Sequence, residues 1–124
     1  MNKSKDQLLY DLIFQNLVEQ GYDVYDFLPP EKTKYPFIHL GEVSIQPIPT
    51  KVVWLGEAEI VINVWGSGND RKKVSDIMNK IIKGNTSFSS FSLIPSRTNL
   101  RILKDNTTSN NLWHGIINMT YKFY

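Results

Sequence analysis

Apolar residues recur at helical spacing in the first segment of the chain, from Leu8 to Val18. Ser4 and Gln7 have the spacing of a capping box before this run, and Gly21 is placed to end a helix. Residues 22–36 then contain three prolines and no sustained period, which is typical of a connecting loop. We therefore expect an amphipathic helix, followed by a loop whose aromatic side chains pack on the core.

A second helical pattern begins after residues 67–70, which supply Gly68 and candidate N-cap side chains. The pattern is closed by Lys83 and Gly84, and its apolar stripe consists of Val74, Ile77, Met78, Ile81 and Ile82. Residues 85–96 are rich in serine and include Pro95, so we expect a flexible loop after this helix.

Alternation of apolar and polar residues predicts four strands, at residues 37–45, 57–65, 97–104 and 113–123. In the second of these, Glu57, Glu59 and Asn63 share one face, and the apolar residues share the other. Pro47 and Pro49 lie between the first two strands and favour an edge or a protruding hairpin tip over a central strand.

These elements follow one another in the order α-β-β-α-β-β. Strands joined by short connections pair antiparallel, and one apolar sheet face needs helices to cover it. We therefore predict an α+β fold with a mainly antiparallel four-stranded sheet and both helices packed on one face. Because 124 residues is about the length of one domain, we expect residues 1–124 to form a single domain.

Composition excludes several classes of function and site. Lysine and arginine total 14 against 12 acidic residues, and a net charge of +2 is too small to attract nucleic acid or anionic membrane to the whole surface. The chain contains no cysteine, which excludes disulfides, thiolate metal sites and cysteine nucleophiles. No signal-peptide pattern opens the sequence, and no segment approaches the roughly 20 apolar residues of a membrane span. We expect a protein kept in solution, without a membrane partner.

Candidate catalytic and metal-binding residues lack the spacing that such sites need. The only histidines, His39 and His114, fall on predicted strands outside any metal-ligand motif, where a half-buried structural histidine is the favoured interpretation. Glu57 and Glu59 lie on the same strand face, as the carboxylates of a glycosidase could, but alternation makes such pairs common on solvated sheets. We predict no catalytic residue, no metal and no cofactor.

Phosphate and nucleophile motifs are also incomplete. The triplet GSG at residues 66–68 lacks the spacing of a phosphate-binding loop, and Asp70 after it favours a helix cap. The serines of residues 87–92 have no nucleophile elbow. The basic run at residues 71–73 fits a solvated helix face better than a phosphate contact, because no stacking aromatic residue accompanies it.

One apolar run has no simple structural explanation. Four successive apolar residues stand where a polar hairpin tip is expected: Val52, Val53, Trp54 and Leu55. The tip either folds back so that Trp54 caps the core, or is exposed as a contact for a neighbouring subunit. We favour the second and take these four residues as a candidate subunit interface.

Three stretches, YPFIHLGE at residues 35–42, VWG at 64–66 and NDRKKV at 69–74, together with the closing strand, resemble a family of small tailed-bacteriophage proteins. These are tail-completion, tail-terminator or head-to-tail joining subunits. The resemblance extends over about residues 8–123 and is one of overall pattern, because none of these motifs is a catalytic signature. The apolar run at residues 52–55 departs from it, since the hairpin is often polar in similar proteins.

The resemblance implies a non-enzymatic virion protein that forms a homo-oligomeric ring, usually a hexamer, at the head-proximal end of the tail. Such a ring ends tail-tube growth, joins the tail to the head connector, or does both. Tail-tube and head-connector proteins are then its partners, and nucleic acid at most passes through the lumen. The resemblance also implies synthesis in the bacterial host cytoplasm and a final place at the head–tail junction of the virion.

Two other functions remain open. A small nucleic-acid-binding α+β module would need stacking aromatic and basic residues on an open sheet face, where the pattern predicts Glu42, Glu57 and Glu59. A small enzyme or ligand-binding domain would use an apolar cavity between helices and sheet, which patterns alone do not reveal. No motif supports either function.

Overall fold

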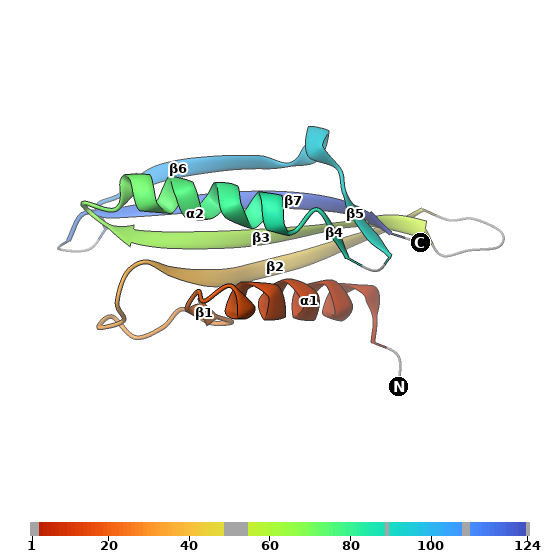
Figure 1. Cartoon of the computed structure of the whole chain (residues 1–124), viewed down its shortest axis with the longest axis horizontal. Coiled ribbons are helices and arrows are strands. Elements are labelled where there is room, and N and C mark those ends of the chain that lie inside the picture. Colours follow the sequence, from red (N-terminus) through yellow and green to blue (C-terminus); the bar gives the residue numbers. More distant parts are fainter. Residues whose placement is uncertain (1–2, 49–54, 89, 108–109, 124) are drawn as a thin grey trace.

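The computed structural model describes residues 3–48, 55–88, 90–107 and 110–123, which form two helices and a twisted sheet (Figure 1). The helices are α1 (Lys5–Glu19) and α2 (Arg71–Gly84). The longer strands are β2 (Phe37–Ile48), β3 (Leu55–Ser67), β6 (Asn99–Asp105) and β7 (Leu112–Phe123). Three short strands are added: β1 (Val24–Tyr25), β4 (Ser87–Phe88) and β5 (Phe91–Leu93). A 3-10 helix, η1 (Pro95–Arg97), connects β5 to β6.

The described strands form one seven-stranded sheet in the order β1-β2-β3-β7-β5-β4, and β6 also pairs with β7. β5 and β6 share one edge of β7, because β5 pairs with residues 121–123 and β6 with residues 112–118. β1 pairs parallel to β2, whereas the other pairings are antiparallel. The α+β class is confirmed. The predicted mainly antiparallel four-stranded sheet is not borne out: the sheet is mixed and has seven strands, because strands of two or three residues are too short for alternation to reveal them.

The core lies between the helices and one face of the sheet. Directly paired residues of β3 and β7 supply its centre, including the pairs Ala58–Tyr121, Ile60–Met119 and Ile62–Ile117. The helices contribute fully buried side chains at helical spacing: Leu9, Ile13 and Leu17 from α1, and Val74, Met78 and Ile81 from α2. Both amphipathic helices predicted from the sequence are therefore confirmed, although Val18, at the end of the first apolar run, is 49% exposed.

The ends of α1 follow the prediction only in part. Gly21 has φ +91°, a conformation that side chains rarely adopt, and so ends the helix as expected. Ser4 occupies the N-cap position but makes no side-chain cap hydrogen bond. Gln7 instead donates from Nε2 to Asp11 Oδ1 at 2.8 Å. The predicted capping box is wrong because Gln7 bonds forward along the helix rather than back to its start.

Residues 85–96, predicted as a flexible loop, contain β4 and β5 and close one end of the core. Phe91 is fully buried and its ring meets Tyr121 edge to face, with centroids 6.4 Å apart. Asn85 is also buried, and its Nδ2 donates to the backbone oxygen of Ile81 at 2.7 Å. Two phenylalanines three residues apart among serines create neither a helical nor a strand period, so the sequence pattern did not reveal this packing.

β2 changes register once along its length. Leu40 pairs with Ile62 and Val43 with Ile60, so Gly41 and Glu42 together stand opposite Val61. This arrangement is a β-bulge. A Cβ on Gly41 would lie 3.0 Å from the backbone oxygen of Val61, which favours glycine at this close approach.

Candidate subunit interface

The proposed interface run lies mostly outside the described residues. Val52, Val53 and Trp54 are not described, so the structure does not test their role. Leu55 is the first residue of β3; it is half-buried and pairs with Ile48 of β2. The antiparallel β2–β3 pair that leads to this run is present as predicted.

An apolar depression of about 420 Å³ lies beside the described ends of β2 and β7. It is lined by Ile45 and Pro47 of β2, by Phe123 of β7, and by residues 3–6 before and in the first turn of α1. The ammonium group of Lys5 lies 5.7 Å from the ring centroids of both Phe91 and Phe123. The charged side chain of Lys5 therefore lies over the aromatic rings at this end of the core.

Exposed apolar side chains identify two further surfaces that the sequence interpretation missed. Phe27 is 79% exposed and Leu28 is 65% exposed, both in the connection between β1 and β2. This connection was expected to pack its aromatic side chains on the core, and Phe27 does not. On β6, Leu100 is 38% exposed and Leu103 is 41% exposed. Residues three apart on a strand point to opposite faces of the sheet. Helices that cover one face can bury only one of these two leucines, and the spacing in the sequence already indicates this.

The sheet face opposite the helices, here called the open face, is polar near the start of β3. A depression of about 200 Å³ is lined there by Ser44, Gln46, Glu57, Glu59, Arg97 and Thr120. Arg97, in η1, donates to the Glu57 carboxylate, so one of the two glutamates on this face is held in an ion pair.

Aromatic rings occupy the other end of the open face. Trp65 and His114 stack with centroids 3.9 Å apart and an interplanar angle of 9°. His114 Nε2 lies 2.7 Å from Asn63 Oδ1. Burial is the largest cause that lowers the pKa of His114, so its ring is neutral at neutral pH. Trp65 and His114 are directly paired residues of β3 and β7. Their stacking supports the prediction that His114 is a half-buried structural histidine.

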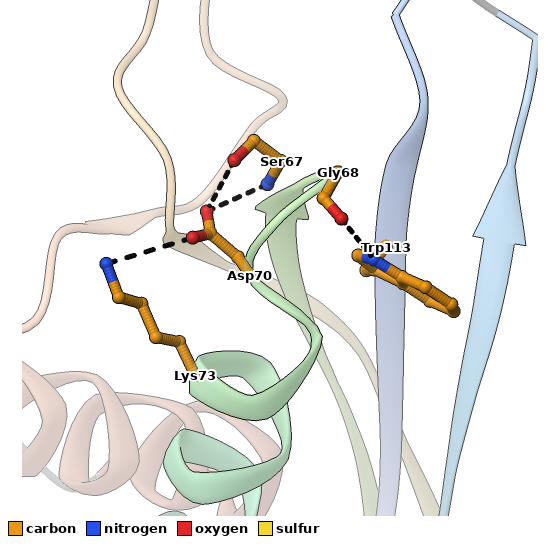
Figure 2. Close-up of polar contacts among 5 residues, drawn as sticks. All are labelled: Ser67, Gly68, Asp70, Lys73 and Trp113. Carbon is orange, nitrogen blue, oxygen red and sulfur yellow. Dashed lines mark hydrogen bonds and ion pairs between the residues drawn. The ribbon is translucent and has the colours of Figure 1, made fainter.

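The turn between β3 and α2 is closed by side chains (Figure 2). Asp70 Oδ2 accepts hydrogen bonds from the backbone nitrogen of Ser67 at 2.9 Å and from its hydroxyl at 2.8 Å. These bonds lower the pKa of Asp70, with a smaller contribution from Lys73, whose ammonium lies 3.8 Å from Oδ1. Trp113 Nε1 donates to the backbone oxygen of Gly68 at 3.0 Å. Asp70 therefore bonds back to the turn, and the expected side-chain cap on α2 is wrong.

Metal-ligand geometry is absent from the described part of the chain, where no group of three His, Asp or Glu residues could hold an ion. His39 pairs with Asn63 across β2 and β3, and His114 stacks on Trp65. Within the same residues, neither helix combines the length and apolar character needed to cross a membrane.

Comparison with known proteins identifies the family. The model of the family "Tail completion protein gp17" matches residues 7–83, more than half of the chain. The fold is similar to the gp17 protein of bacteriophage SPP1, at 20% identity and a TM-score of 0.61, over 98% of this chain and 93% of that one. It is also similar to a chain in the virion of a native gene transfer agent particle, at 13% identity and a TM-score of 0.58, over 90% and 92% of the two chains. No curated protein sequence matches the chain significantly.

The two structural likenesses, at these identities, establish the fold, and the family match establishes membership. The resemblance noted in the sequence is thereby confirmed at the level of the family. The chain belongs to the tail completion protein gp17 family and is a structural protein of a phage tail.

Proposed function

We propose that this chain assembles with copies of itself into a ring, a hexamer, at the head-proximal end of a phage tail. There the ring ends growth of the tail tube, joins the tail to the head connector, or does both. In this proposal residues 1–124 act as a single non-catalytic domain without a cofactor. The run from Val52 to Leu55 lies at a contact between neighbouring subunits.

The observation that carries the proposal is the family match over residues 7–83. This range includes most of both helices and the whole of β1, β2 and β3, so the family likeness involves the core of the fold. The non-catalytic part of the proposal is supported by the ion pair of Glu57 with Arg97 and by the stacking of His114 on Trp65. These contacts give one glutamate and one histidine of the open face a structural role.

The location is tested with purified tail tubes. The chain carrying a small electron-dense label on its N-terminus is mixed with tubes that lack it, and the tubes are examined by electron microscopy. We expect label at one end of each tube, the end that later receives the head. Label spread along the tubes, or no label at all, would contradict the proposal.

The contact run is tested with Trp54→Ala. We expect the substitution to lower the assembled mass measured by light scattering after size exclusion, and to weaken tail joining, because buried tryptophans are often the strongest anchors of an interface. If both assembly and joining are unchanged, Trp54 belongs to a single subunit's own structure. The matched control is Trp113→Phe, since the Trp113 indole already bonds Gly68 within the chain.

A further inference from the structure

Charge is divided unevenly along the chain, although its net charge is only +2. Residues 1–48 contain seven Asp or Glu and four Lys. Residues 68–124 contain nine Lys or Arg and three Asp. The chain thus combines an acidic first part with a basic last part, and the whole-chain charge hides the difference.

The fold brings these two parts to opposite edges of the sheet (Figure 1). β1 and β2 form one edge, with α1 packed beside them, and we call α1, β1 and β2 the acidic edge. β6 lies at the other edge, and α2 packs across β3, β7 and β6. We call α2 and β6 the basic edge. β3 and β7 separate the two, so the molecule carries opposite charge on its two long sides.

Both edges present strand backbone that lacks a strand partner among the described residues. β6 pairs with β7 along residues 99–105, and its outer side has no pairing. β2 pairs with β1 only at Ile38 and His39, which leaves residues 40–48 without a strand on their outer side. Such edges expose rows of backbone N–H and C=O groups that a second chain can approach.

The apolar side chains of β6 favour a partner at its edge over a partner on either face. Leu100 pairs with Ile117 and points to the helix side of the sheet, whereas Leu103 pairs with His114 and points to the open face. Both are more than a third exposed. Only a partner that lies along the edge would contact both leucines at once, because an object on one face would leave the other leucine in water.

Charged side chains on the two edges also lack ion pairs within the described part of the chain. On the basic edge these are Lys80, Lys83 and Arg101, all of them exposed. On the acidic edge Glu42, at the bulge of β2, and Asp23, next to β1, are exposed in the same way. Opposite charges of this kind steer association and fix its orientation more than they add affinity.

We propose that copies of this chain associate head to tail, with the basic edge of one copy against the acidic edge of the next. This inference rests on the proposed ring and names its contact surfaces. Two identical edges would bring Arg101 near Arg101 or Glu42 near Glu42, and this repulsion disfavours a closed two-fold dimer. A head-to-tail contact instead leaves one edge of each kind available, so copies add until the rotation closes a ring.

A charge exchange tests the contact. Arg101→Glu with Lys104→Glu makes β6, the strand of the basic edge, acidic, and Asp23→Lys with Glu42→Lys places positive charges along the β1–β2 side of the acidic edge. We expect each double variant alone to lose the assembled mass seen for the wild type, and an equal mixture to recover it as alternating copies. The single control Lys122→Glu, on the open face, keeps the wild-type mass. The proposal is wrong if either double variant still assembles alone or if the mixture fails to recover the assembly.

Cross-linking separates this inference from the proposed function. The chain contains no cysteine, so Ser44→Cys on β2 and Leu103→Cys on β6 introduce the only thiols. A short bismaleimide should then link the double variant into a ladder, in solution or on tail tubes, while each single variant gives no ladder. A ladder without label at tube ends would contradict the proposed location at the tail end and would support the edge contact. Rings at tube ends without a ladder would contradict the edge contact and leave the proposed function unaffected.

Discussion

The hydroxyl of Tyr121 donates a 2.5 Å hydrogen bond to the backbone oxygen of Asn85, and this bond ties β7 to the residue that follows α2. Both residues are fully buried. Burial raises the pKa of Tyr121, so the hydroxyl keeps its proton and remains a donor at any pH at which the protein is handled.

Tyr121→Phe should therefore lower the free energy of unfolding by about 1–3 kcal/mol, because it leaves a buried carbonyl without this donor. Urea unfolding followed by circular dichroism measures the change. Tyr10→Phe is the matched control, since the Tyr10 hydroxyl has no hydrogen bond among the described residues; its effect should stay within about 0.5 kcal/mol. Equal losses in the two variants would show that the bond to Asn85 contributes nothing.

Gly56 is packed against the end of β7. A Cβ on Gly56 would lie 2.6 Å from Phe123 Cζ and 2.7 Å from the backbone oxygen of Gln46. We expect Gly56→Ala to lower the free energy of unfolding by about 1–3 kcal/mol through overpacking. Gly68→Ala is the control, because the nearest atom to its added Cβ would be Asn111 O at 3.4 Å. Thermal unfolding of both variants measures the effect. An unchanged midpoint temperature for Gly56→Ala would refute the argument that an added Cβ clashes with Phe123 and Gln46.

Two phenylalanines of very different burial make a third matched pair. Phe91 is fully buried between Tyr121 and Phe123, whereas Phe27 is 79% exposed. Phe91→Ala should lower the free energy of unfolding by about 3–5 kcal/mol. Phe27→Ala should change it by less than about 0.5 kcal/mol. A large loss in unfolding free energy for Phe27→Ala would mean that this side chain is packed in solution.

Asp70 gives the turn before α2 a dependence on pH. Its pKa is lowered in the folded state, chiefly by the hydrogen bonds from Ser67, so the contribution to stability is complete above the unfolded pKa of about 3.9. It declines as the pH falls through the lower, folded pKa. Asp70→Asn should flatten this acid part of the stability curve, measured by urea unfolding between about pH 2 and 6.

Ser67→Ala is the companion variant for Asp70. It removes the hydroxyl donor and retains the backbone donor, so the pKa of Asp70 should move part of the way toward its ordinary value. A carboxyl NMR titration reads this change directly. No movement of the pKa would show that the hydroxyl does not act on Asp70.

The sequence predicted the elements that are long enough to be periodic. Apart from the exposed Val18, the apolar residues predicted for the two helices lie in the core or pack against it, and the longer strands lie close to their predicted ranges. The missed strands β1, β4 and β5 have two or three residues, and their pairing depends on where β2 and β7 already lie. Tertiary position, which no local pattern records, decides such pairings.

The candidate site was predictable only in part. The apolar run from Val52 to Leu55 was found from its sequence because it breaks the polar rule for hairpin tips, and its role as a contact stays a prediction. The exposure of Leu100 and Leu103 was not predicted, because the pattern of residues 97–104 indicates only a strand and not its place at the edge of the sheet. The division of charge was visible in the sequence, but its meaning depends on which residues lie at which edge of the sheet.

The bulge in β2 also sets where this strand can change length. Gly41 and Glu42 together face one residue of β3, so deleting one of them would restore regular pairing and keep every other β2 side chain on its own face. A deletion elsewhere in β2 would turn the residues on one side of it to the opposite face, and would carry Ile38 and Leu40, or Val43 and Ile45, out of the core. Within β2, related chains that are one residue shorter are therefore expected to lack a residue at this position.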